Sequence, residues 1–403
     1  MKATKAQDAR SAQFMQKSAS QKEHMNVAIV HDWLVTYGGA ESVVESLLKL
    51  FPKADIYTLV YDKKRMGAHF TENRIFTSSL QKLPFASKLY TKLLKFMPKA
   101  FESFDFSAYD LVICSSSSCA KGVITPPAVP HIAYIHTPMR YAWDLFFDYR
   151  KRSGALTRFF MNRWMGQIRM WDYISSARID MLLANSHYIA RRIKKFWGRE
   201  AAVIYPPVHL EKFAPVKNPS CDYYVAFSRL VPYKRIDVAI DACKMLGKKL
   251  VVIGSGSEEK KLKVRVHGAD ITFTGRICDE DVCAYLQNCR ALLFCAEEDF
   301  GIVPLEAQAC GRPVIAFGKG GTLETVKDGK TGIFFAEQTA AALADAIVRF
   351  EKLDDAATFN PAVIVKHAQQ FSEEAFLQNF NAAVKTALAE NGCNSYNRNI
   401  IKK

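Results

Sequence analysis

The sequence predicts an α/β protein made of two doubly wound domains. Short apolar strands alternate with amphipathic helices along most of the chain, which is typical of a parallel sheet with helices on both faces. A proline-bearing segment, 205–219, separates two such series, and 403 residues suffice for two domains of about 100–200 residues each. We therefore expect a hinge at this segment and a ligand in a cleft between the domains, at the carboxyl ends of the strands.

The two series of elements set the predicted domain bounds. The first begins with the strand Val27–Val30, a glycine turn at Gly38 and Gly39, and a helix with apolar residues from Val43 to Leu50, and its further strands are expected at 111–114, 131–135 and 181–184. The second series has strands at 223–228, 250–253, 271–273, 291–295 and 313–316, with helices near 237–246, 280–288 and 303–310. The predicted parts are a disordered extension at 1–24, domains at 25–206 and 207–365, a helix returning to the first domain at 366–390, and a tail at 391–403.

Composition narrows the function classes. Hydrophobic residues make up 49% of the chain, yet no apolar run approaches the about 18 residues of a membrane-spanning helix. The formal net charge of +15 predicts an anionic partner, which could be nucleic acid, an anionic membrane surface or a phosphorylated substrate. Nucleic acid is the weakest of these candidates, because the chain has no zinc-finger spacing or RNA-binding aromatic motif. The ten cysteines form no Cys-x-x-Cys pair, and the first 24 residues lack the apolar centre of a signal peptide, which predicts a cytoplasmic protein with reduced thiols.

Two carboxylates, Glu298 and Glu306, flank a turn that follows an apolar strand and opens a helix. Pro304 suits the first helical position, which would put Glu306 in the first turn. Backbone N–H groups near Gly301 and Ile302 would then face a diphosphate at the helix terminus. The alternative is that Glu306 only complements the helix dipole and Glu298 is a solvated loop residue.

A second charged segment follows the strand that ends at Ser228. Arg229 and Lys234 can flank one anion there, beside the Gly254-Ser-Gly256 turn, unless they form only a solvated basic turn. That turn does not complete the dinucleotide fingerprint, because Glu259 occupies the third glycine position, and no phosphate loop of the Gly-x-x-x-x-Gly-Lys type exists. Dehydrogenase and P-loop chemistry are therefore disfavoured.

The motifs taken together resemble the family 4 retaining glycosyltransferases of the GT-B fold. The resemblance extends from about Val27 to Phe380. Its segments are Gly38-Gly39-Ala40-Glu41, Ala184-Asn185-Ser186, Tyr205-Pro-Pro-Val208, Arg229 to Lys234, Phe273-Thr-Gly-Arg276, Glu298 to Glu306 and Ala309-Cys-Gly-Arg-Pro-Val314. The combination is far more specific than any single segment.

The resemblance implies catalytic and donor-binding roles for individual residues. Arg229 and Lys234 would bind the donor diphosphate and stabilise the charge of the leaving nucleotide, in place of a metal ion or other cofactor. Glu298 would contact the donor sugar, and Glu306 would hold the ribose hydroxyls. Further donor contacts are expected from Gly39, Gly254, Arg276, Ile277, Phe300, Gly301 and Ile302. The acidic run Asp279-Glu280-Asp281 is interpreted as a helix start and not as a metal site.

His136 ends a strand of the first domain. A lone histidine at a strand end is more often structural, but the resemblance implies contact with the transferred sugar and hence a catalytic role. Arg140, Tyr141 and Asp144 follow on the same loop and are expected on the acceptor side, with simple packing as the alternative.

A basic amphipathic helix is predicted from Lys88 to Phe101, with Pro98 ending or kinking it. Lys88, Lys92 and Lys95 would meet an anionic membrane surface, unless the apolar side is ordinary core and the lysines are solvated. The arginines of 150–169 lie among aromatic residues and extend this surface.

These observations predict a cytoplasmic enzyme, peripheral on the inner face of the membrane, that moves a hexose to a lipid-linked saccharide. The overall likeness is to the O-antigen and exopolysaccharide mannosyltransferase branch, which implies GDP-mannose as donor. The alternatives are a UDP-sugar-dependent transferase, a non-catalytic nucleotide-sugar-binding scaffold, and an epimerase of the same fold.

Overall fold

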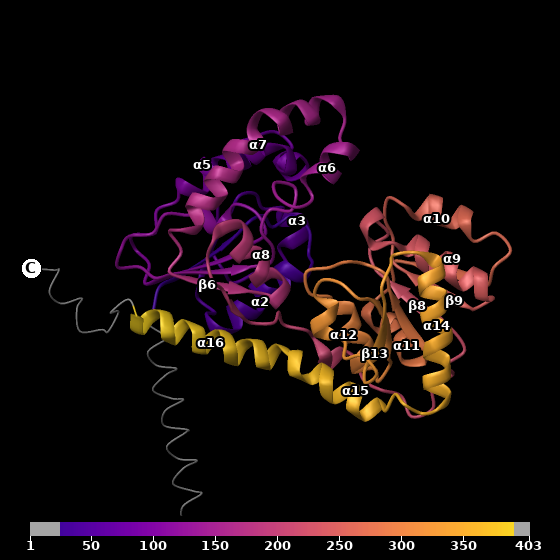
Figure 1. Cartoon of the computed structure of the whole chain (residues 1–403). Coiled ribbons are helices and arrows are strands. Elements are labelled where there is room, and N and C mark those ends of the chain that lie inside the picture. The colour runs from indigo at the N-terminus through magenta and orange to yellow at the C-terminus, as the bar shows by residue number, and fades with distance from the viewer. Residues whose placement is uncertain (1–24, 391–403) are drawn as a thin grey trace, which may run out of the picture. The chain divides into compact units, whose positions relative to one another are not determined.

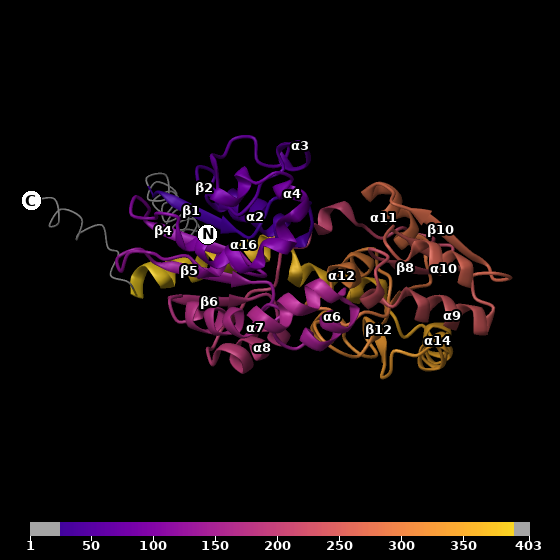
Figure 2. The ribbon, with the colours of Figure 1, turned by 90° about the horizontal axis from the view of Figure 1, so that it is seen from above.

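The computed structural model describes residues 25–390 of the chain, so the predicted extension at 1–24 and tail at 391–403 lie outside the described residues. The described chain forms two compact units (Figures 1 and 2). The N-terminal unit contains the residues up to Ala184, Ile189–Val203 and the chain from Asn379. The C-terminal unit contains Asn185–Tyr188 and Ile204–Gln378.

The N-terminal unit is built on a seven-stranded parallel sheet in the order β3-β2-β1-β4-β5-β6-β7. The strands are β1 (Val27–His31), β2 (Asp55–Thr58), β3 (Ile75–Thr77), β4 (Leu111–Ser116), β5 (His131–Ile135), β6 (Met181–Ala184) and β7 (Ala202–Val203). All residues of β1, β4 and β5 are buried, which explains their continuous apolar character, because helices cover both faces of a parallel sheet. The order reverses between β1 and β4, and this is the switch point where doubly wound sheets bind ligands.

Helices connect these strands. They are α2 (Gly39–Leu50), α3 (Lys63–Met66), α4 (Ala86–Leu89), α5 (Met97–Glu102), α6 (Phe146–Arg152), α7 (Ala155–Ser176) and α8 (His187–Trp197), with the 3-10 helices η1 (Ser79–Lys82), η2 (Tyr90–Phe96) and η3 (Ala120–Gly122). The long helix α16 (Glu373–Glu390), yellow in Figure 1, contributes its part from Asn379 to this unit, where Phe380 lies 6.3 Å from the ring of Tyr134. Within residues 25–390, no helix is both long and apolar enough to cross a bilayer.

The single basic helix predicted from Lys88 to Phe101 is wrong. The segment is broken into α4, η2 and α5, and α5 restarts with Pro98 in its first turn. Proline is tolerated there because the first N–H groups of a helix need no partner within it. Lys88 therefore lies in the last turn of α4, whereas Lys92 and Lys95 share one side of η2, since a 3-10 helix repeats every three residues.

The C-terminal unit contains a six-stranded parallel sheet in the order β10-β9-β8-β11-β12-β13. Its strands are β8 (Tyr224–Phe227), β9 (Leu250–Ile253), β10 (Ile271–Gly275), β11 (Ala291–Phe294), β12 (Val314–Phe317) and β13 (Gly332–Phe335). Its helices are α9 (Ile236–Leu246), α10 (Glu259–Arg265), α11 (Asp279–Asn288), α12 (Ile302–Ala309), α13 (Thr322–Thr325), α14 (Ala340–Asp355) and α15 (Pro361–Ala368), with η4 (Leu210–Lys212), η5 (Pro232–Lys234) and η6 (Gln369–Phe371). Two doubly wound α/β units are thus confirmed.

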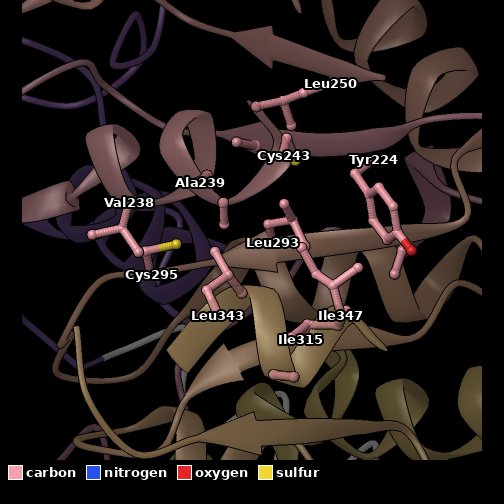
Figure 3. Close-up of a cluster of buried hydrophobic side chains, with 14 of the residues drawn as sticks. Tyr224, Val238, Ala239, Cys243, Leu250, Leu293, Cys295, Ile315, Leu343 and Ile347 are labelled. Atoms are coloured by element: carbon pink, nitrogen blue, oxygen red, sulfur yellow. The ribbon is translucent and has the colours of Figure 1, made fainter. Parts of the chain in front are cut away.

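Alternate residues of the central strands fill two cores in this unit. In β11, Leu293 points into the cluster shown in Figure 3, together with Ile315 of β12 and Ile347 of α14. Its neighbours Leu292 and Phe294 belong to the core on the other face of the sheet. Two buried faces hold the sheet in place, so the loops at its carboxyl edge start from a rigid base.

Candidate active site

The loops after β8 and β11 leave the C-terminal sheet side by side, because these two strands are neighbours at the switch point. The loop after β8 leads through η5, which ends at Lys234. The loop after β11 leads through Glu298 to α12. Both predicted charged segments therefore start from one point of one sheet edge.

Lys234 and Glu298 form an ion pair between the Nζ and Oε1 atoms across these two loops, and both side chains are largely buried. Their contact excludes the alternative that Glu298 is a solvated loop residue. Arg229 lies on the same loop as Lys234 and is exposed, with its guanidinium 3.4 Å from the hydroxyl of Tyr233. Arg235, which directly follows Lys234, has a left-handed backbone (φ 52°). Its guanidinium donates to the carboxylate of Asp237 and to the carbonyl of Gln338.

Two glycines let neighbouring loops approach this pair. Gly254, after β9, has φ +122°, and a Cβ there would lie 1.9 Å from the carbonyl oxygen of Ser228. Gly321, after β12, would place a Cβ 2.3 Å from the Cα of Phe300, and its N–H donates to the carbonyl of Glu298 at 2.8 Å. Neither site tolerates a side chain without movement of the backbone. Gly254 and Gly321 thus support the loops that carry Lys234 and Glu298.

Glu306 lies in the second turn of α12, because the helix begins at Ile302 after Gly301 (φ +94°). The prediction of a first-turn position was wrong, since Pro304 is the third helical residue and not the first. The Oε2 atom of Glu306 is shielded from solvent and has no hydrogen-bond partner among residues 25–390. Burial raises the pKa of Glu306 to about 7; the charge of Asp279 adds to this rise, and that of Lys212 opposes it. A buried carboxyl oxygen without a partner is suited to receive hydroxyl groups of a ligand.

The remaining predicted donor contacts are distributed along the same sheet edge. The side chain of Phe300 is buried with Val208, Leu305 and Phe371, so only its backbone is available to a ligand. Arg276 is exposed after β10, and Ile277 packs against the core, both two strands away from β8. Asp279 begins α11 and pairs with Lys212 at 2.8 Å, in agreement with its interpretation as a helix start.

In the N-terminal unit, His136 follows β5 at the carboxyl edge of the sheet. Its Nε2 lies 2.8 Å from the hydroxyl of Ser115, at the end of β4. Ser115 in turn contacts His31 at the end of β1, and His31 faces Glu41 of α2. Gly39, the first residue of α2, is exposed. Burial, with the charge of His31, lowers the pKa of His136 to about 3, so this imidazole is neutral.

Sequence reasoning missed His31, Asp32 and Ser115. Asp32 is buried, and its carboxylate accepts the backbone N–H groups of Ser117, Ser118 and Ala120, which shapes the turn after β4. A polar His-Asp pair directly after an apolar strand was the available signal. Such a pair at a strand's carboxyl end indicates a site edge in a parallel sheet.

The predicted acceptor-side residues are held by the surrounding structure. Asp144 pairs with the buried Arg192 of α8 at 2.6 Å, and Arg192 also donates to the hydroxyl of Thr137. The hydroxyl of Tyr141 lies 2.7 Å from that of Ser118. Arg140 is partly exposed on the same loop. The carboxylate of Asp144 thus ties down the loop that follows His136, and its role toward an acceptor stays a prediction.

A buried ion pair also anchors the loop that follows His136. Asp172 of α7 lies 3.1 Å from Nζ of Lys121, and its second oxygen accepts the indole N–H groups of Trp143 and Trp197. Both charges are buried, and each has further hydrogen bonds, as a buried ion pair requires. Asp172 therefore links the loop at Trp143 to α7 and α8.

Two family models match adjacent stretches of the chain. The model described as Glycosyltransferase Family 4 matches residues 37–212, and the model described as Glycosyl transferases group 1 matches residues 210–376. Together they cover residues 37–376, which include His136, Lys234, Glu298 and Glu306 but not β1. The chain belongs to glycosyltransferase family 4. Its two parallel-sheet units are those of the GT-B fold.

Similar proteins include two mannosyltransferases and one solved structure that contains UDP and glucose. The glycosyltransferase is 23% identical to an alpha-1,3/1,6-mannosyltransferase of Dictyostelium discoideum, over 90% of this chain and 99% of the relative. It is 29% identical to a GDP-mannose-dependent alpha-(1-6)-phosphatidylinositol monomannoside mannosyltransferase of Mycobacterium tuberculosis, over 42% of this chain and 51% of that relative. The solved structure of HepE from Anabaena in complex with UDP and glucose matches with a TM-score of 0.65 and 19% identity, covering 90% of this chain and 100% of HepE.

Proposed function

We propose that this glycosyltransferase moves mannose from GDP-mannose to a lipid-linked saccharide with retention of the anomeric configuration, in O-antigen, exopolysaccharide or related cell-surface glycan synthesis. The observation that carries the proposal is the Lys234–Glu298 pair at the switch point of the C-terminal sheet in a family 4 chain. The names of two relatives, both mannosyltransferases and one GDP-mannose-dependent, support the donor. The phosphatidylinositol monomannoside in the second name supports an acceptor on a lipid.

The chemistry can be assigned to the chain's own groups. The bond between the sugar C1 and the diphosphate oxygen breaks, and its electron pair goes to that oxygen. Lys234 and Arg229 stabilise the negative charge that develops there. The acceptor hydroxyl oxygen bonds to C1 on the same face and gives its proton to the departing phosphate. Glu298 and His136 contact the transferred sugar, while the carboxyl group of Glu306 receives the ribose hydroxyls.

A donor panel tests this proposal. We expect purified enzyme with a lipid-linked saccharide acceptor to release GDP from GDP-mannose at least tenfold faster than UDP from UDP-glucose, UDP-galactose or UDP-N-acetylglucosamine. Activity should persist in EDTA, because the two cations act in place of a metal ion. Complete loss in EDTA with recovery on adding Mg²⁺ or Mn²⁺ would overturn the metal-free step. Product analysis by mass spectrometry excludes an epimerase, which alters the sugar without an acceptor.

The second candidate function is transfer from a UDP-sugar. It is favoured by the match of HepE, solved with UDP and glucose, to nine-tenths of the chain. Faster turnover of any UDP-sugar in the same panel decides for this candidate. Binding of donors without any turnover supports a non-catalytic scaffold instead.

We also propose that the N-terminal unit binds the cytoplasmic face of an anionic membrane. Two segments, 82–99 and 146–171, together carry eleven lysines and arginines and one acidic residue. They meet where Nζ of Lys95 lies 3.9 Å from the ring centre of Trp164. Large apolar side chains are exposed beside these cations, with exposed fractions of 70% at Phe85, 72% at Phe147, 69% at Leu156 and 60% at Phe159. Exposed aromatic groups among cations are typical of proteins that lie on anionic lipid.

Replacing Lys88, Lys92 and Lys95 with glutamine should weaken binding to vesicles that contain phosphatidylglycerol. Each lysine near such a surface contributes about 1 kcal/mol, so the triple variant should bind on the order of 100-fold more weakly at low salt. The effect should shrink in about 0.5 M NaCl, where charges are screened. Co-sedimentation with vesicles measures it.

The matched control replaces three exposed lysines of the C-terminal unit, Lys249, Lys260 and Lys330, with glutamine. This control changes the net charge equally and should leave vesicle binding within about twofold. Turnover of a soluble acceptor should be unchanged in both variants. Equal weakening by the two triple variants would show that net charge alone, and not this surface, attracts the vesicles.

A further inference from the structure

Four side chains form an unbroken polar chain at the carboxyl edge of the N-terminal sheet. Glu41 Oε1 lies 3.4 Å from Nε2 of His31. Nδ1 of His31 lies 3.0 Å from the carbonyl oxygen of Ser115 and 3.2 Å from its hydroxyl. That hydroxyl lies 2.8 Å from Nε2 of His136. Glu41, His31 and Ser115 are buried, so solvent does not supply alternative partners to their contacts.

The chemistry of the partners determines where the protons lie on His31. A backbone carbonyl only accepts, so Nδ1 of His31 must donate to Ser115. A carboxylate also only accepts, so Nε2 of His31 must donate to Glu41. Both ring nitrogens therefore carry protons, and His31 is an imidazolium paired with the Glu41 carboxylate. The pKa of His31 agrees: burial lowers it, but the hydrogen bond and charge of Glu41, with the charge of Asp32, together raise it above the ordinary value.

The same reasoning extends through Ser115 to His136. The Ser115 hydroxyl oxygen receives the N–H of His31, which leaves its own hydrogen to donate to Nε2 of His136. Nε2 of His136 is then an acceptor, and the ring proton resides on Nδ1. A neutral His136 is required for this arrangement, because an imidazolium would carry protons on both nitrogens.

We propose that the Glu41–His31 pair acts through Ser115 as a positioning device that holds His136 as the Nδ1–H tautomer. The inference rests on the proposed function, in which His136 contacts the transferred sugar. Under it, His136 carries its ring proton on Nδ1 and does not act as a general base through Nε2. Glu41, His31 and Ser115 are positioning residues, and Glu41 is supplied by the first turn of α2, directly after Gly38.

Histidine NMR on the full-length enzyme tests the tautomer without any substrate. We expect the ¹⁵N spectrum of histidine-labelled protein at pH 7 to show one neutral ring protonated at Nδ1, which disappears in His136→Asn. A second ring, lost in His31→Gln, should be protonated at both nitrogens. A His136 signal with the proton on Nε2, or a neutral His31 at pH 7, overturns the proposal. Because this readout needs no turnover, an inactive enzyme would refute the proposed function and not this inference.

Variants test the consequence for catalysis. Ser115→Ala removes only the connecting hydroxyl, and Glu41→Gln removes the charge that keeps His31 protonated. Each should lower kcat about tenfold with a donor KM within twofold, and each should shift His136 toward a mixture of tautomers. The kcat of the double variant should fall no further than that of Ser115→Ala alone, because both changes interrupt the same row of hydrogen bonds from Glu41 to His136. Fully additive losses, or an unchanged tautomer in folded Ser115→Ala, contradict the device.

Discussion

Lys234→Ala is expected to lower turnover by about 100- to 1,000-fold, which corresponds to about 3–4 kcal/mol of lost transition-state stabilisation. The ammonium group lies at the switch point against Glu298, on a loop supported by Gly254, where it would stabilise the charge of the leaving diphosphate. The substitution also leaves the Glu298 carboxylate without its cation, and that carboxylate then repels the diphosphate. Single-turnover transfer with saturating donor measures the loss.

Two variants make this expectation specific. Lys249→Ala removes an exposed lysine of the same unit before β9, at the amino end of the sheet, and should leave turnover unchanged. Lys234→Arg keeps the positive charge and should recover part of the rate, although a guanidinium does not have the shape of an ammonium group. Wild-type turnover in folded Lys234→Ala would remove this residue from the mechanism.

Glu306→Gln is expected to stabilise the fold of the free enzyme and to weaken binding of the donor. The pKa of the Glu306 carboxyl is raised by burial from 4.5 to about 7, so the fold favours the neutral form. As the pH rises from about 4.5 to above 7, the unfolded chain loses this proton first and the stability of the wild type falls. At pH 8 the ionisation of buried Glu306 lowers the free energy of unfolding by about 3 kcal/mol. The glutamine variant has no such ionisation and keeps this stability. Urea unfolding should show a more stable variant at pH 8 and nearly equal proteins at pH 4.5.

At pH 8, where most of the wild-type Glu306 carboxyl is ionised, the same variant should bind GDP or UDP at least tenfold more weakly by calorimetry, since hydrogen bonds to a charged acceptor contribute about 1.5–3 kcal/mol. Glu337→Gln, at an exposed position of the same unit, is the control and should alter neither stability nor affinity. A pH-independent stability difference would refute the raised pKa. Unchanged nucleotide affinity would refute contact with the ribose.

Strands buried on both faces were the most predictable part of the fold. The bounds of β5, β6 and β9 agree with the predicted ones, because four or five consecutive apolar residues between helices leave little ambiguity. No strand was predicted at β2, β3, β7 or β13. β3 is only partly buried, and β7 has two residues, so neither shows a continuous apolar run.

Helix bounds near proline were less predictable. Pro304 and Pro98 each fit more than one position in a first turn, and the helix starts were settled by the neighbouring backbone. The 3-10 conformation of η2 had no signal in the spacing of its lysines. Packing of the surrounding residues overrides local propensity in such short segments.

The residues alone are sufficient to predict the fold class, the family and the edge at which Lys234 and Glu298 meet, because strand ends, glycine turns and charges are local features and parallel topology brings strand ends together. Only the folded chain shows that Glu306 keeps an unpaired buried oxygen, or that Glu41 reaches His136 through His31 and Ser115. These properties depend on burial and on contacts such as that of His31 with Ser115, 84 residues away. The spacing of residues along a sequence reveals neither the burial of a group nor such long-range contacts.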